Sequence, residues 1–157
     1  MRTIIQALTI VTAVSIATSA LAGPLDRFSG RWAGWGEVAT TSGNSEKLKC
    51  ATTYKVIKGG TKARQNFRCQ SASYRFDAVA NYTAKGAMLS GDWRETIYSV
   101  GGSLKGRIRG GIVDMTIRAD SFVGQVGIRS AKCRQSISIR PSGGVEISSI
   151  IVNLRRC

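Results

Sequence analysis

Four cysteines are the residues of this chain best suited to form covalent or metal bonds, and their surroundings favour disulfides. The chain has 157 residues and no histidine, and no two cysteines form a C-x-x-C pair. Cysteine-based zinc sites usually need closely spaced cysteines or histidine partners. We therefore expect two disulfide bonds and no bound metal, although sequence alone allows three ways of pairing four cysteines. The cysteines are Cys50, Cys69, Cys133 and Cys157.

The lack of histidine also removes the commonest general base and the Ser-His-Asp and Cys-His arrangements. Paired carboxylates remain as candidates, because glycoside hydrolases use two such groups. Asp92 and Glu95 would point to opposite faces of a strand, however, and Asp114 and Asp120 lie about 20 Å apart along an extended chain. We therefore expect a protein without enzymatic activity and without a cofactor.

A hairpin turn at residues 58–61, Lys-Gly-Gly-Thr, predicts which cysteines pair. Two adjacent glycines can adopt the positive φ angles of a two-residue hairpin turn. A hairpin centred on these glycines places Val56 opposite Ala63 and Cys50 opposite Cys69, within the Cα spacing that a disulfide tolerates. The register therefore predicts a Cys50–Cys69 bond.

The remaining pair, Cys133 and Cys157, is less simply placed. A turn at residues 141–144, Pro-Ser-Gly-Gly, would put Cys133 opposite Val152 instead of Cys157. The second disulfide therefore needs a bulge, a longer loop or an arrangement other than a simple hairpin.

The N-terminal 22 residues predict export. An apolar stretch from Ile4 to Ala17 follows Arg2 and ends in residues 20–22, Ala-Leu-Ala, which is typical of a secretory signal peptide cleaved before Gly23. The apolar stretch is too short for a membrane span. We expect a cleaved signal peptide over residues 1–22 and a single domain over residues 23–157, located in the periplasm or secreted, where disulfides form.

Beyond the signal peptide, apolar and polar residues alternate with the period of two that is typical of half-buried strands. About ten short strands in one domain must close or pair their edges. The sequence therefore predicts an all-β fold, an antiparallel up-and-down β-barrel or a two-sheet sandwich of about 8–10 strands. The expected strands cover residues 31–40, 48–56, the second arm of the hairpin, 72–82, 87–99, 103–109, 111–119, 121–129, 133–140 and 145–154.

A Gly-x-Trp pattern at Gly30-Arg31-Trp32 opens the first expected strand, with Trp35 on the opposite face. The pattern is similar to the opening of lipocalin-type barrels, and this resemblance implies that Trp32 closes one end. We expect the aromatic side chains to fill a small barrel, with a ligand-holding cup as the alternative. The side chains in question are Trp32, Trp93, Tyr54, Phe67, Tyr74 and Phe76.

The chain is strongly basic, with a net charge of +14 at pH 7, and two outward rows concentrate this charge. Like charges directly opposite each other on a sheet are unfavourable, and a bound anion would relieve them. The alternative is a solvated surface whose charges are screened by salt. The candidate anion-binding residues are Lys49, Lys55, Arg64 and Arg68 on the hairpin, and Lys105, Arg107 and Arg109 on a later strand.

Four segments resemble small, uncharacterised exported proteins of alphaproteobacteria, of the rhizobial kind. They are residues 28–32 (FSGRW), 64–69 (RQNFRC), 90–93 (SGDW) and 133–137 (CRQSI). The resemblance implies a periplasmic or secreted envelope protein and supplies no site residues.

Together these features predict a non-enzymatic exported protein that binds an anionic envelope component or an acidic protein. Lipopolysaccharide, phospholipid headgroups and acidic glycans are the envelope components that a basic surface would attract. The alternatives are a lipocalin-like carrier of a small ligand and an inhibitor of exported proteases. We expect no nucleic-acid tail, because lysine and arginine form no run of five or more. We expect no membrane-spanning barrel, because the chain ends in Arg-Arg-Cys instead of the terminal aromatic residue of an outer-membrane barrel.

Overall fold

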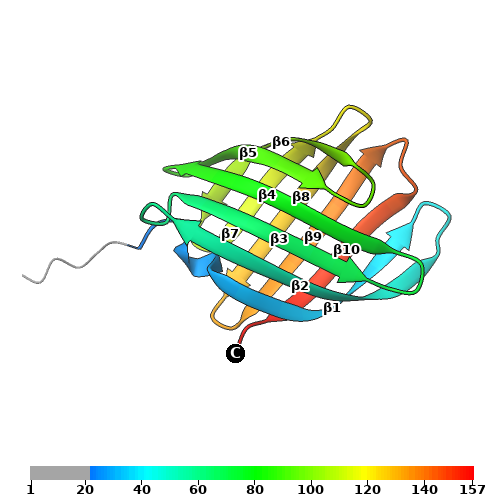
Figure 1. Ribbon diagram of the computed structural model, residues 1–157, viewed down its shortest axis with the longest axis horizontal. Coiled ribbons are helices and arrows are strands. Elements are labelled where there is room, and N and C mark those ends of the chain that lie inside the picture. Colours follow the sequence, from blue (N-terminus) through cyan, green and yellow to red (C-terminus); the bar gives the residue numbers. More distant parts are fainter. Residues whose placement is uncertain (1–21) are drawn as a thin grey trace, which may run out of the picture.

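The computed structural model describes residues 22–157, which form a closed antiparallel barrel of ten strands (Figure 1). Each strand pairs with the next in sequence, and the first pairs with the last to close the barrel. The predicted all-β, up-and-down barrel is confirmed. The strands are β1 (Gly30–Thr40), β2 (Ser45–Ile57), β3 (Lys62–Gln70), β4 (Arg75–Lys85), β5 (Met88–Glu95), β6 (Val100–Arg109), β7 (Ile112–Arg118), β8 (Phe122–Ala131), β9 (Arg134–Gly143) and β10 (Ile147–Arg155).

The predicted signal peptide lies, except for Ala22, outside the described residues. In the part of the chain that the structure describes, no helix is long and apolar enough to span a membrane. The two disulfides indicate a protein of an oxidising, non-cytoplasmic compartment.

Alternating burial along the strands gives the barrel one apolar interior and one polar exterior. On β3, Ala63, Gln65, Phe67 and Cys69 are buried while each intervening residue is exposed. Because the side chains of a strand alternate between its two faces, this pattern fixes which residues point into the barrel.

The β2–β3 hairpin has the predicted register. Val56 lies opposite Ala63 and Cys50 opposite Cys69, and the two cysteines form a disulfide inside the barrel. Gly59 and Gly60 have φ angles of 62° and 76°, as the turn requires.

The predicted Cys133–Cys157 disulfide is also confirmed, but the position predicted for the β9–β10 turn is wrong. Strand β9 continues through Pro141, close to its end, where a strand tolerates proline. The turn therefore moves to residues 144–146, and Arg134 pairs with Arg155. Cys133 and Cys157 lie just beyond this last pair and can bond.

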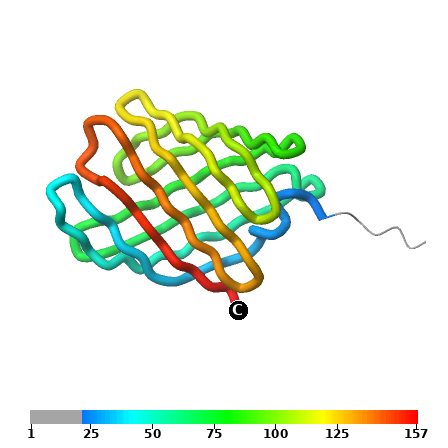
Figure 2. The backbone as a smooth tube through the Cα atoms, turned by 180° about the vertical axis from the view of Figure 1, so that it is seen from behind, coloured from blue at the N-terminus to red at the C-terminus, as the bar shows by residue number. Residues whose placement is uncertain are grey.

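The two ends of the barrel differ. At one end, which we call the closed end, the short 3-10 helix η1 (Asp26–Phe28) packs against the barrel together with the C-terminus (Figure 2). The other end, which we call the open end, carries the loops 41–44, 71–74, 96–99, 119–121 and 144–146.

Candidate ligand-binding cavity

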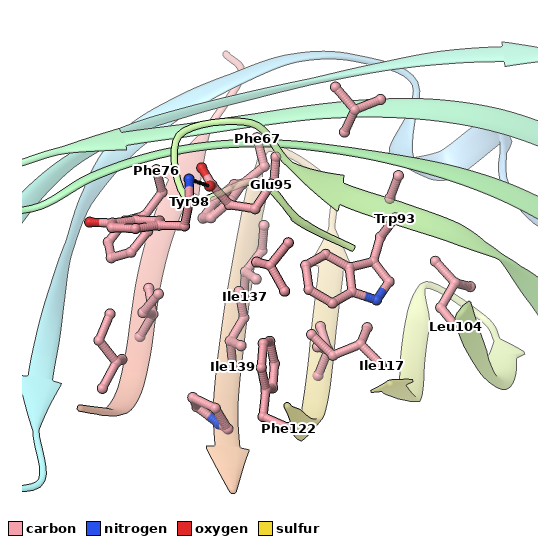
Figure 3. A pocket seen from close by; sticks show the side chains of 18 of the residues that line it. Phe67, Phe76, Trp93, Glu95, Tyr98, Leu104, Ile117, Phe122, Ile137 and Ile139 are labelled. Atoms are coloured by element: carbon pink, nitrogen blue, oxygen red, sulfur yellow. Dashed lines mark hydrogen bonds between the residues drawn. The ribbon is translucent and has the colours of Figure 1, made fainter. Parts of the chain in front are cut away.

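The interior of the barrel contains a cavity of about 480 Å³ (Figure 3). This volume lies within the range of roughly 300–1,000 Å³ that is typical of small-molecule sites. The lining is mainly aliphatic and aromatic and comes from strands β3 to β10. It includes Phe67, Phe76, Ala78, Ala80, Tyr82, Trp93, Leu104, Met115, Ile117, Phe122, Val126, Ile128, Ile137, Ile139, Ile147 and Ile150.

Small side chains on the inward face of β4 leave part of the barrel interior unfilled. The inward face of β4 carries Ala78 and Ala80 between the larger Phe76 and Tyr82. Alanine cannot reach the opposite wall, so the interior is not filled here. The prediction that the aromatic residues fill the barrel is therefore wrong for Phe67, Tyr74, Phe76 and Trp93, which line a cavity.

The closed end is filled. Trp32 is fully buried, and its indole N–H donates a hydrogen bond to the carbonyl of Phe28 in η1 (2.8 Å). The guanidinium of Arg156 lies 4.4 Å from the centre of the Trp32 ring and donates to the carbonyls of Arg27 and Ser29. Trp32 thus closes one end of the barrel, as its Gly-x-Trp motif implies.

A buried polar network lies between the filled end and the cavity. The side-chain amide of Gln65 donates to Thr52 (3.0 Å) and Tyr54 (2.9 Å), and Tyr82 donates back to Gln65. Tyr54 in turn donates to Gln135 across the barrel (3.3 Å). Burial away from water raises the pKa of both Tyr54 and Tyr82, because it disfavours the charged phenolate. Both tyrosines are therefore neutral donors near neutral pH.

Glu95, at the end of β5, is a buried carboxylate at the edge of the cavity. It is only 7% exposed, and it accepts the backbone N–H groups of Asp77 (2.7 Å) and Tyr98 (2.6 Å). Figure 3 shows Glu95 beside Phe76 and Tyr98. The hydrogen bond to Tyr98 forms within a turn, so β5 ends at Glu95 instead of continuing to residue 99.

Three aromatic rings lie near Glu95 at the open end. The rings of Tyr74 and Phe76 are stacked with centroids 6.3 Å apart, and Phe76 and Tyr98 are 6.2 Å apart. The hydroxyl of Tyr74 donates to Glu146 (3.0 Å), and this hydrogen bond raises the pKa of Tyr74. We call Tyr74, Phe76 and Tyr98 the aromatic trio.

Trp93 projects into the cavity from β5, two residues before Glu95 (Figure 3). Its ring packs against Phe122 with centroids 5.7 Å apart. Its indole N–H is buried and has no hydrogen-bond partner among residues 22–157. The cavity therefore contains one hydrogen-bond donor that the described protein atoms do not satisfy.

The candidate anion-binding residues all lie on the outer surface. Lys55 is opposite Arg64, as predicted. Strands β4 and β5 separate the hairpin residues from the row on β6, so the fold does not bring the two groups together. The exposed residues are Lys49, Lys55, Arg64, Arg68, Lys105, Arg107 and Arg109.

Several of these basic residues have partners on the surface. Arg68 forms an ion pair with Asp77 (3.0 Å), and Arg107 lies opposite Asp114. Lys49 lies 5.9 Å from the ring centre of the exposed Trp35. The ion pair compensates the charge of Arg68, and binding of an anionic envelope component stays a prediction.

The carboxylate pairs do not converge. Asp92 is exposed on the outside of β5 and accepts a hydrogen bond from Asn81, whereas Glu95 points inward. Asp114 is exposed on β7 and is paired with Arg129, and Asp120 is exposed beyond the end of that strand. Among the described residues, no group of three metal-ligating side chains comes together.

The sequence left an internal cavity as the alternative to a filled barrel, and it suggested Glu95 only as a catalytic carboxylate. Two features of the sequence could have indicated the cavity and the inward position of Glu95. Ala78 and Ala80 are small residues on an inward face, and Glu95 shares the inward face of Trp93.

The fold and the cavity define a closed, ten-stranded antiparallel β-barrel with an internal cavity. No protein-family model and no curated protein matches this sequence. Among solved structures, the barrel is similar to that of the S-type phycobiliprotein lyase CPES from Guillardia theta, with a TM-score of 0.57 and 8% sequence identity. The similarity covers 85% of this chain and 90% of that chain. At this identity the similarity concerns the fold alone.

Proposed function

We propose that this protein is a non-enzymatic, periplasmic or secreted carrier that binds a small, largely apolar ligand inside the barrel. The observation that carries the proposal is the apolar cavity of about 480 Å³ in a barrel that is plugged at one end. Burial of apolar surface contributes about 25 cal/mol per Å², so a hydrophobic ligand would gain most of its affinity from such a lining.

The filled end of the barrel also lies apart from the apolar cavity. The polar network and the Trp32 plug lie toward the closed end, so the apolar side chains farther along the barrel can leave a cavity without exposing the whole core. This separation suits a carrier, whose site must admit and release its ligand while the fold persists.

The proposal is tested by titrating the purified protein with Nile red, an uncharged apolar dye whose fluorescence rises in apolar surroundings. The double variant Ala78→Leu/Ala80→Leu adds side-chain volume to the cavity from β4. We expect it to weaken Nile red binding about tenfold or more, a loss of about 1.4 kcal/mol.

The matched control is Ala33→Leu/Ala51→Leu. These two alanines lie opposite each other on β1 and β2, outside the cavity lining, and the substitutions add the same volume. We expect binding to be unchanged. Absence of dye binding to the unsubstituted protein, or equal binding by both variants, would contradict the carrier proposal.

A further inference from the structure

The charge of the cavity is opposite to the charge of the protein. The chain carries a net charge of +14, yet no lysine or arginine of residues 22–157 lines the cavity. The charged residues of the lining are two carboxylates, Glu95 and Glu146. A ligand with a carboxylate or phosphate group would therefore meet negative charge and no basic partner at this site.

Glu95 itself lacks a charged partner. The ion pairs of the described residues join Arg68 to Asp77 and Arg129 to Asp114, and none involves Glu95. Its two hydrogen bonds come from neutral backbone N–H groups and use one site on each oxygen, whereas an ionised carboxylate can accept about four. Burial of an ionised carboxylate is costly unless a charge compensates it. A cationic group on the ligand would provide that compensation.

The aromatic trio adds a second feature that favours a cation. The electron-rich faces of aromatic rings attract ammonium groups, and cages of such rings recognise alkylated ammonium ligands. Tyr74, Phe76 and Tyr98 line the cavity with Glu95 and Glu146, and Tyr74 is hydrogen-bonded to Glu146. Carboxylates and ring faces thus occur together at the open end.

The deeper lining is suited to the apolar part of the same ligand. Leu104, Ile117 and Ile137 form apolar walls there, and the unpartnered N–H of Trp93 can donate to an oxygen or a ring within the ligand (Figure 3). The cavity therefore combines an apolar interior with a cation-favouring entrance.

We propose that the cavity binds cationic amphiphiles, with the ammonium group held by Glu95 and the aromatic trio and the hydrocarbon part inside the barrel. This inference rests on the proposed carrier function and specifies the class of its ligand.

The test compares three ligands with the same hydrocarbon chain: dodecylammonium, dodecanol and dodecanoate. Each is titrated into the purified protein at pH 7 by calorimetry, the ammonium and the carboxylate below their micelle concentrations and dodecanol below its solubility limit. We expect dodecylammonium to bind about tenfold more tightly than dodecanoate, although nonspecific attraction to a protein of charge +14 would favour the anion.

The variant Glu95→Gln removes the buried charge at nearly constant shape. We expect it to weaken dodecylammonium binding about tenfold and to leave dodecanol binding unchanged. The matched control is Asp92→Asn on the outer face of the same strand, which should alter neither. If Glu95→Gln does not fold, Phe76→Leu tests the aromatic trio, and it should weaken binding of the ammonium ligand more than that of the alcohol.

The outcomes separate the two proposals. If none of the three ligands binds, the carrier function and the cation site both fail. If all three bind equally, or if dodecanoate binds most tightly, the cation site fails and the carrier function stands. An unchanged ammonium preference in Glu95→Gln contradicts the role assigned to Glu95.

Discussion

Two buried tryptophans show how differently the two ends of this barrel are built. At the closed end, Trp32 is fully buried, its N–H is bonded to Phe28, and Arg156 covers its ring. In the open half, Trp93 lines the cavity, and its N–H has no partner among the described residues. A tryptophan therefore completes the packing at the closed end, whereas a second tryptophan borders the cavity in the open half.

The comparison suggests that the closed end contributes mainly to stability and the open end mainly to ligand binding. Close packing around the fully buried Trp32 should concentrate stability at the closed end. Regions that bind ligands are generally less tightly packed than the rest of a protein, because they must open and adapt. We therefore expect substitutions at the closed end to affect stability most, and substitutions at the open end to affect binding most.

Replacing Trp32 should have the largest effect on stability. Trp32→Ala leaves a large cavity in a filled region, so we expect the free energy of unfolding to fall by about 3–5 kcal/mol. Urea denaturation measures the change. Trp35→Ala is the control, because Trp35 is 53% exposed on the outer face; its effect should be near 0.5 kcal/mol. Similar losses in both variants would show that the plug is not a main source of stability.

The two disulfides should contribute comparable stability but differ in access. They span 19 and 24 residues, so loss of either should lower the free energy of unfolding by about 3 kcal/mol. Cys50 and Cys69 are buried, whereas Cys157 is exposed. Mild reductant should therefore open Cys133–Cys157 first in the folded protein, as followed by non-reducing peptide mapping. Earlier loss of Cys50–Cys69 would contradict the buried position of that bond.

Alkaline pH should destabilise the protein by ionising the two tyrosines of the polar network. Burial raises the pKa of Tyr54 and Tyr82 above the unfolded value of about 10. Their contribution is therefore fully present below about pH 10 and is lost as the pH rises toward the folded pKa. Above pH 10, each of the two tyrosines should lower the free energy of unfolding by about 1.4 kcal/mol per pH unit. Tyr82→Phe keeps only Tyr54, so the free energy of unfolding of this variant should fall half as steeply with pH.

Paired measurements of tyrosinate absorbance and circular dichroism test this prediction. The phenolates of Tyr54 and Tyr82 should appear only as the strand signal is lost. Ionisation of all four tyrosines in a protein that keeps its strand signal would show that the network is open to solvent.

A matched pair of leucines tests the smallest difference between the ends. Leu154 and Leu104 are each 1% exposed, but only Leu104 lines the cavity. A side chain that borders a cavity has fewer contacts to lose. We expect Leu154→Ala to cost about 1 kcal/mol more than Leu104→Ala, within the spread seen for buried leucines. Equal costs by urea denaturation would mean that the two regions are packed equally well.

The sequence indicated the strands because the signals that set them are local. Alternation of period two marks each strand, and the glycine turn at residues 58–61 fixes the β2–β3 register and therefore the Cys50–Cys69 bond. The β9–β10 turn was misplaced because Pro141 and two glycines are typical of a turn, while pairing with Gly124 of β8 keeps Pro141 in a strand. Neighbouring strands, which local patterns do not describe, decided that position.

By itself, the sequence determined which face of each strand is apolar, that Cys50 bonds to Cys69 and that the chain forms an all-β domain, because these follow from spacing along one or two neighbouring strands. Only the tertiary structure decided whether the interior is filled. Closure of ten strands fixes the width of the barrel, and side chains from distant segments either meet across it, as Tyr54 and Gln135 do, or leave space, as around Ala78 and Ala80. The grouping of Glu95, Glu146 and the aromatic trio at one entrance depends on that closure.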